Sequence, residues 1–389
     1  MAVLTAASEV PVHNLADDLL TYKCGASVVI YKGGFVGHDM GGYAKPLVPP
    51  DDFLGIAYES VTASATAGAS TVRVFHGGVF DFTLTGVTQI DVGKPVFATN
   101  DGTISLTGHP DCFVGRIIGV QATGIAKILL RKPFEKIATG EVDGVYDMNW
   151  SGAKCISSPT VLAIIDASEG LAVGDGWTSH LVGATGSPTL SYNVTLGETI
   201  FTPAVAAEVG NVGIRTPHCF NITKGIKFDL IGRLGVVGVS TTHLDFGIGA
   251  LSTTGMSITQ FVDPYGVQTA GYKRAAVRIT STTPATVASA YSGVAAEVAA
   301  SYTIAPMVNS LTLNQRYVLI ARPAGTFEIW GGSVVAGSCT MAKPTTEPTW
   351  ATTITTGIFC GFFNVAKVSA DATQTLAYVK NLRVSGALI

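Results

Sequence analysis

The hydrophobic and polar positions of residues 79–85 alternate in the way that predicts a half-buried β-strand. One set of side chains, Phe80, Phe82 and Leu84, falls on one side of an extended chain, and the other, Asp81, Thr83 and Thr85, falls on the opposite side. Further along, Asn100-Asp101-Gly102 has the composition of a tight turn, in which glycine supplies the positive φ. The stretch 77–132 is therefore predicted to be a β-sheet scaffold.

Short apolar runs broken by glycine and proline extend this pattern over residues 22–133. The runs that predict strands are residues 28–31, 53–57, 72–74, 79–84, 95–98, 113–120 and 126–130. Short strands at this density, with almost no helical periodicity, predict a small, mostly antiparallel β-barrel or sandwich.

Strand patterns resume from residue 191. Residues 226–230 and 244–248 alternate, residues 316–322 form a continuous apolar strand, and residues 357–363 and 377–384 complete the set. Residues 326–335 predict a hairpin that turns at Gly331-Gly332. Tyr291, Val294 and Val298 have the spacing of one helical face. The predicted fold class is all-β, with that short helix as an exception.

Shifts in the pattern divide the chain into four predicted segments. They are an N-terminal arm (1–22), a small β-barrel-like domain (23–133), a glycine-rich connector with a few strands (134–190) and an antiparallel β-sandwich (191–389). The apolar residues of the arm are Val3, Leu4, Val10, Val12 and Leu15. Two readings stay open for the arm: a poorly ordered tail, or a segment that orders on a partner. Its apolar content favours the second reading.

The composition adds one main observation, which is that charged residues are scarce. Of the 389 residues, 47% are hydrophobic and 13% are charged, against about 25% charged in an ordinary soluble domain. A neutral surface can be buried in an assembly at little desolvation cost, although a β-rich protein from a secreted or salt-tolerant setting has a similar composition. The net charge of −3 argues against direct nucleic-acid binding. Arg131-Lys132 and Lys273-Arg274 are expected to be solvated strand ends.

Neither a membrane segment nor a redox site is predicted. No apolar run approaches the about 18–20 residues of a spanning helix, and Met1-Ala2-Val3-Leu4 lacks a basic start, so synthesis in a cytoplasm is expected. The six cysteines are scattered without a Cys-x-x-Cys pair. Cys339 and Cys360 stay open between a cross-strand pair and buried free thiols.

The sequence contains no convincing catalytic constellation. Ser151 and Lys154 match Ser-x-x-Lys without its companion motif, and the seven histidines occur singly. Asp17-Asp18 and Asp51-Asp52 are sequential, so they would point to opposite faces of an extended chain. We therefore expect no catalytic residue, no metal site, no cofactor and no enzymatic activity.

Four aromatic residues are candidates for a binding surface. They are Tyr265, Tyr272, Trp330 and Trp350. In one reading they stack on sugar rings or fill a pocket between subunits, and in the other they belong to the core or its rim.

A series of glycine-containing phrases follows one order along residues 20–133. The phrases are Gly25-Ala26-Ser27-Val28, Tyr31-Lys32-Gly33-Gly34, Gly41-Gly42-Tyr43-Ala44 with Pro46, Phe53-Leu54-Gly55-Ile56-Ala57, Gly77-Gly78-Val79-Phe80, Asp91-Val92-Gly93-Lys94-Pro95-Val96-Phe97-Ala98 and Val114-Gly115-Arg116-Ile117. Together they resemble the tailed-phage capsid cement, or head decoration, family. The resemblance implies a β-barrel-like domain on the outside of an icosahedral head, a homotrimer at three-fold positions, and an arm that contacts the major capsid protein. This chain continues far beyond Pro133, near which such proteins usually end.

A second resemblance covers residues 191–389. The strand and hairpin of residues 316–335, residues 357–361 and the closing strand 378–384 recur in the order seen in concanavalin-like, laminin-G-like jelly rolls. Such sandwiches bind glycans in some proteins and are purely structural in others. The expected function is that of a structural virion protein on the outer surface of the capsid, which stabilises the capsid lattice. The alternative is a carbohydrate-binding adhesion module for host-surface glycans. A glycan-degrading enzyme is the third, for which the sequence offers no convergent carboxylates.

Overall fold

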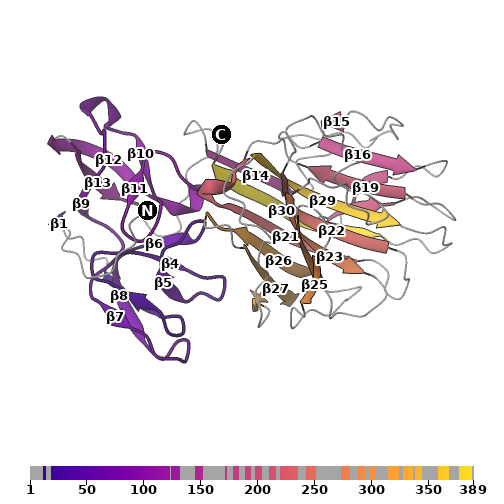
Figure 1. Ribbon diagram of the computed structural model, residues 1–389, viewed down its shortest axis with the longest axis horizontal. Helices are drawn as coiled ribbons and strands as arrows, with labels where there is room; N and C mark the ends of the chain where they lie inside the picture. Colours follow the sequence, from indigo (N-terminus) through magenta and orange to yellow (C-terminus); the bar gives the residue numbers. More distant parts are fainter. Residues whose placement is uncertain are drawn as a thin grey trace. The chain divides into compact units, whose positions relative to one another are not determined.

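In a computed structural model, the regular secondary structure of the described residues consists of β-strands and three short 3₁₀ turns, which confirms the predicted all-β fold class. The structure describes residues 12–14, 19–122, 124–131, 145–151, 171–172, 178–183, 189–193, 198–203, 210–215, 220–234, 242–250, 273–280, 288–293, 298–302, 314–323, 327–335, 338–343, 358–367 and 376–387. They form two compact units (Figure 1). Unit 1 is Met1–Tyr146 with Gly386–Leu388, and unit 2 is Asp147–Ser385 with Ile389.

Unit 1 contains three antiparallel sheets. The six-stranded sheet has the order β1 (Val12–Asn14), β9 (Val79–Thr83), β13 (Ile125–Leu130), β12 (Phe113–Ala122), β10 (Pro95–Ala98) and β11 (Ile104–Ser105). The five-stranded sheet has the order β2 (Leu19–Lys23), β8 (Thr71–Phe75), β6 (Asp52–Ala57), β4 (Phe35–His38) and β5 (Ala44–Pro46), and β3 (Val29–Ile30) pairs with β7 (Val61–Thr62). Two 3₁₀ turns, η1 (Gln89–Asp91) and η2 (Pro110–Cys112), connect strands of the larger sheet.

The main core of unit 1 lies between the six-stranded and five-stranded sheets. Phe80, Ile117 and Ile128 from one sheet meet Phe35 and Phe53 from the other. The predicted alternation of residues 79–85 is confirmed, because Phe80 and Leu84 are buried, Phe82 packs against this core and Thr83 is exposed. The apolar run of β6 is buried on both faces, since a second core lies on the other side of its sheet.

Local geometry explains why two of the predicted features fall where they do. Gly55 in β6 has φ +153°, and a Cβ atom there would lie 2.1 Å from the Phe75 carbonyl oxygen, so only glycine lets β6 and β8 approach this closely. The predicted turn at residues 100–102 joins β10 to β11, but Gly102 does not have the predicted positive φ; instead, Asn100 Oδ1 accepts a hydrogen bond from Gly102 N at 2.8 Å and holds the turn.

Parts of the predicted N-terminal arm belong to the sheets of unit 1. Val12 in β1 pairs with Phe80, and β2 pairs along its length with β8. The rest of the arm, including Val3, Leu4, Val10 and Leu15, lies outside the described residues. A truncation that leaves these sheets intact must therefore stop before Val12.

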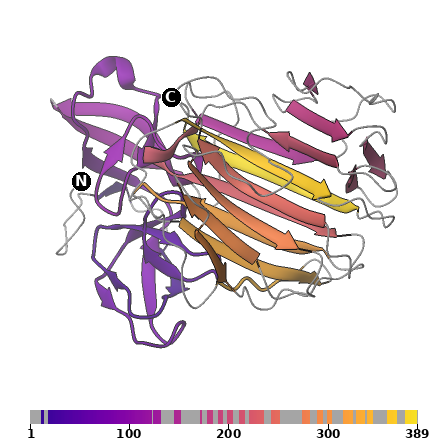
Figure 2. The same ribbon diagram turned by 45° about the vertical axis from the view of Figure 1, so that its right-hand side comes forward.

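Unit 2 contains two large antiparallel sheets (Figure 2). One has the order β17 (Thr189–Asn193), β18 (Glu198–Thr202), β30 (Ala377–Ala387), β21 (Ile226–Leu234), β26 (Gln315–Ala321), β27 (Phe327–Val335) and β28 (Ser338–Cys339), and β14 (Val145–Ser151) also pairs with β30. The other has the order β15 (Leu171–Ala172), β16 (Thr178–Gly183), β19 (Gly210–Arg215), β29 (Ile358–Lys367), β22 (Thr242–Ala250), β23 (Lys273–Thr280), β24 (Ala288–Gly293) and β25 (Val298–Tyr302), and β20 (Phe220–Asn221) also pairs with β29. The 3₁₀ turn η3 (Ile222–Lys224) precedes β21.

Aromatic contacts across the two sheets show that unit 2 is a β-sandwich. Phe228 of β21 stacks on Phe246 of β22 at 5.7 Å between ring centroids, and Phe201 of β18 meets Phe363 of β29 at 4.7 Å. All four rings are fully buried. The described strands of the predicted connector, β14, β15 and β16, all pair with strands of this sandwich.

Two local predictions for unit 2 are wrong. Gly331-Gly332 does not form a hairpin turn, because β27 runs straight through both residues and pairs with β26. A Cβ atom on Gly332 would lie 2.3 Å from the Thr340 carbonyl oxygen, so this glycine serves close packing. The helix predicted around Tyr291 and Val298 is instead the hairpin of β24 and β25, whose pairing outweighs a weak helical spacing.

Among the described residues, no helix is long and apolar enough to cross a membrane. Cys24, Cys112 and Cys339 are free thiols. Cys339 is therefore unpaired, in agreement with the free-thiol alternative.

Candidate functional site

The strongest candidate for a functional site is an apolar face on unit 1. In β13 the side chains of Ala126, Ile128 and Leu130 are buried, so Ile125 and Leu129 point to the opposite side of the sheet. Leu129 is 48% exposed, and Ile118 on the neighbouring strand β12 is 46% exposed. We call Ile118, Ile125, Leu129 and the Lys127 between them the outer face.

The η1 turn, defined here as residues 88–94, continues this apolar surface. Gly93 N donates to Ile117 O at 2.7 Å, and Ile117 N donates to Lys94 O at 3.0 Å, so the turn is joined to β12 next to Ile118. At its tip, Ile90 is 83% exposed. The outer face and the η1 turn are thus two exposed apolar parts of unit 1 that are joined through β12.

Charged side chains on this surface are paired within the chain. Lys127 Nζ lies 3.4 Å from Asp81 Oδ1, and Lys94 Nζ lies 2.8 Å from Asp91 Oδ1. The hydrogen bond from Lys94, together with those from Thr88, holds the pKa of Asp91 below its usual value. Arg116, the cross-strand partner of Leu129, donates to Gly93 O at 3.1 Å, so this surface is apolar and carries one positive charge besides the two ion pairs.

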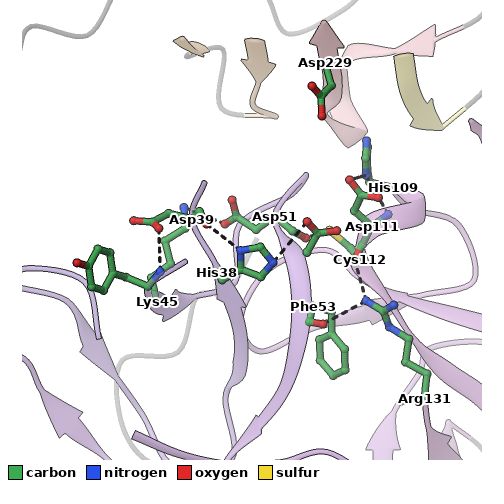
Figure 3. A network of polar contacts seen from close by, with 12 residues as sticks. His38, Asp39, Lys45, Asp51, Phe53, His109, Asp111, Cys112, Arg131 and Asp229 are labelled. Atoms are coloured by element: carbon green, nitrogen blue, oxygen red, sulfur yellow. Dashed lines mark hydrogen bonds and ion pairs between the residues drawn. The ribbon is translucent and has the colours of Figure 1, made fainter. Parts of the chain in front are cut away.

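A second candidate is the network of polar side chains in unit 1 that includes His38, Asp51 and Arg131 (Figure 3). Asp51 is almost fully buried, and its Oδ2 accepts from Val48 N at 3.1 Å and lies 3.0 Å from Lys45 Nζ. His38 Nδ1 donates to Asp39 O at 2.8 Å, while its Nε2 lies 3.5 Å from Asp52 Oδ2. These contacts join β4, β5 and the start of β6.

His109, Asp111 and Cys112 bring a nucleophile, a base and a carboxylate into one turn of this network. The Cys112 thiol donates to Asp51 O at 3.4 Å, and His109 Nδ1 accepts from Asp111 N at 3.1 Å. Burial, reinforced by the nearby carboxylates of Asp51 and Asp111, raises the pKa of the Cys112 thiol well above its usual value. The thiol therefore stays protonated and bonded to a carbonyl, which suits a structural role.

Arg131 corrects a prediction made from the sequence. It was expected at a solvated strand end, but it is 6% exposed, and its Nη2 donates to Phe53 O at 3.2 Å and Asp111 O at 3.1 Å. Its guanidinium also lies over the rings of Phe53 and Phe113, at 5.6 and 5.7 Å from their centroids. Arg131 thus links β13 to β6 and η2.

The predicted aromatic site residues are not brought together in the described part of the chain. Trp330 in β27 is 6% exposed, and its Nε1 donates to Glu328 Oε2 at 3.1 Å, so it is buried on the side of the sheet that carries Glu328, in agreement with the reading as a core or rim residue. Tyr265, Tyr272 and Trp350 lie outside the described residues. Among the described residues, no group of three or more His, Cys, Asp or Glu side chains could hold a metal ion.

Sequence reasoning missed Ile90. One signal was present: Thr88-Gln89-Ile90-Asp91 has the Thr-x-x-Asp spacing of a capping box, in which Thr88 and Asp91 bond reciprocally. That spacing predicts the turn. It does not predict that the isoleucine inside the turn points to solvent.

The chain matches no protein-family model and no curated protein sequence. Among solved structures it is similar to peanut lectin (10% identity, TM-score 0.39, 63% of this chain and 98% of that chain) and to lectin II from Ulex europaeus (9% identity, TM-score 0.38, 62% and 98%). The Emp46p carbohydrate recognition domain is another neighbour (10% identity, TM-score 0.37, 54% and 88%). A likeness this weak carries no information about what this chain binds.

Proposed function

We propose that this protein is a structural, non-catalytic binding protein that attaches through unit 1 to the outside of an icosahedral phage head and displays the β-sandwich of unit 2. The observation that carries the proposal is the exposed apolar surface of the outer face and the η1 turn. The ordered glycine phrases of residues 20–133, which resemble capsid cement proteins, indicate the kind of partner.

The physical basis of attachment is burial of this surface. Leu129 and Ile118 are about half exposed in the single chain, and burying such side chains contributes roughly 25 cal/mol per Å². Their charged neighbour Lys127 is already paired with Asp81, which limits the desolvation cost. Many copies bound to one lattice would stabilise the assembled shell by mass action.

Replacing Ile118 and Leu129 together by threonine is expected to weaken binding to heads by at least about tenfold. Threonine is β-branched, which suits a strand, but it removes apolar area from the interface, and each about 1.4 kcal/mol lost is a factor of ten in Kd. The measurement is co-sedimentation of the full chain with heads of the encoding phage, prepared without this protein.

Val335→Thr is the matched control, because Val335 is an exposed valine of unit 2 that lies outside the outer face. It is expected to bind as the unaltered protein does. The proposal is overturned if the unaltered protein does not bind heads, or if the double variant binds as tightly as the control.

Carbohydrate binding by unit 2 is the second candidate function. Several of the similar solved structures are named as lectins or as a carbohydrate recognition domain. The candidate rests on two charged pairs on the side of the eight-stranded sheet opposite Phe228, where the buried side chains of Val318 and Ile320 lie between them. Arg316 Nε contacts Asp229 Oδ1 at 3.0 Å, and Arg322 Nε contacts Glu328 Oε1 at 2.8 Å. Planar charged groups of this kind hold sugar hydroxyls through paired hydrogen bonds.

A glycan array probed with the full chain tests this candidate. Binding that is lost in Asp229→Asn and kept in Lys380→Met, which changes an exposed residue of the same sheet, would support it. An array on which the unaltered protein binds no glycan would reject it.

A further inference from the structure

The η1 turn holds its exposed side chain on a rigid frame. The Asp91 carboxylate accepts from Thr88 N at 2.8 Å and from Thr88 Oγ1 at 3.0 Å, and it also binds Lys94 Nζ. Gly93 has φ +90°, a conformation that favours glycine, and it leads the chain back into its hydrogen bond with Ile117 O. The backbone on both sides of Ile90 is therefore held before any partner arrives.

An exposed apolar side chain on such a frame has the properties of an interface anchor. Ile90 is 83% exposed and is the most exposed of the large hydrophobic side chains among the described residues. Val92, in the same turn, is 38% exposed. Because the turn is already ordered, little conformational entropy is lost when the side chain enters a pocket, so most of the burial contributes to affinity.

The charges around Ile90 restrict the chemistry of the partner. Asp91 is paired with Lys94, and the Arg116 guanidinium donates to Gly93 O at 3.1 Å. The charges of Asp91 and Lys94 cancel within the turn, and Arg116 of β12 adds one positive charge beside it, which is far fewer than the several cations that bind the phosphate groups of a nucleic acid or of an anionic membrane. A neutral, apolar protein pocket is complementary to it.

We propose that Ile90 is the anchor with which unit 1 enters an apolar, uncharged pocket on the outer surface of the shell protein. This inference rests on the proposed attachment to heads. It adds two points: Ile90 is the residue that determines the affinity, and the pocket that receives it is apolar and uncharged.

The test measures binding of three full-length variants to heads prepared without this protein. Ile90→Ser is expected to weaken binding by about tenfold or more, whereas Ile90→Val, which keeps an apolar branched side chain, should stay within about threefold of the unaltered protein. Asp91→Ala leaves Ile90 in place but loosens the turn, and it should weaken binding severalfold. Because Ile90 is exposed, its variants should unfold at the same urea concentration as the unaltered protein.

The outcomes separate this inference from the attachment proposal. If the unaltered protein binds heads and Ile90→Ser binds equally well, the anchor is overturned and attachment stands. If the unaltered protein does not bind heads, both are overturned. If sedimentation shows that Ile90→Ser instead disrupts self-association in the absence of heads, the pocket belongs to a second copy of this chain and the proposed occupant is wrong.

Discussion

Phe80→Ala is expected to lower the free energy of unfolding of unit 1 by about 3–5 kcal/mol. The side chain is fully buried and packs in the core between the six-stranded and five-stranded sheets. Its ring lies 5.7 Å from that of Phe75 and 6.3 Å from that of Phe82, measured between centroids. Alanine would remove these contacts and leave a cavity, because the other buried side chains between the two sheets keep the sheets from closing over it.

The distribution of tryptophan makes this prediction measurable for unit 1 alone. All four tryptophans, Trp150, Trp177, Trp330 and Trp350, lie in unit 2. Urea unfolding followed by circular dichroism should therefore show an earlier transition in Phe80→Ala, while tryptophan fluorescence stays unchanged. Thr83→Ala, an exposed position of the same strand, should shift stability by no more than about 0.5 kcal/mol. An unchanged circular dichroism midpoint in Phe80→Ala would contradict the prediction.

Arg233→Met is expected to destabilise unit 2 by about 3–5 kcal/mol. Arg233 Nη2 lies 2.7 Å from Glu198 Oε2, and both side chains are largely buried. The guanidinium also lies 4.0 Å from the ring centroid of Tyr378. Methionine fills similar space but cannot pair with the Glu198 carboxylate. That carboxylate would keep the hydrogen bond from Asn314 Nδ2 to its Oε1, at 3.2 Å, but would lose its cation. A buried carboxylate without a cation is costly.

A double variant distinguishes lost charge pairing from lost packing. Glu198→Gln added to Arg233→Met removes the uncompensated charge, so it should recover part of the loss measured by tryptophan fluorescence in urea. Lys380→Met, at an exposed position of β30, should change stability by no more than about 0.5 kcal/mol. If the double variant is less stable than Arg233→Met, packing rather than charge governs this site.

The strands of this protein could be predicted because their signal is local. The alternation of Phe80, Phe82 and Leu84 with polar residues predicts both a strand and the side of it that is buried. The structure has the strand β9 at this place, with Phe80 buried. The turn at residues 100–102 is equally local, since the Asn100 side chain bonds to the backbone two residues on.

One glycine pattern was ambiguous for a physical reason. Glycine allows a tight turn, and it also allows another chain segment to approach closely. Gly331-Gly332 was predicted to be a turn, but a Cβ on Gly332 would collide with the Thr340 carbonyl, which comes near only in the folded sheet.

The sequence by itself determined the all-β class, most strands of unit 1 and the scarcity of charge, because these follow from local periodicity and composition. Only the tertiary structure decided that Arg131 and Trp330 are buried and that Ile90 is exposed. Burial depends on which segments pack together, and those segments are far apart in the chain. Arg131, for example, meets Phe53 across 78 positions. The candidate attachment surface is defined by exposure, and for that reason no motif in the sequence revealed it.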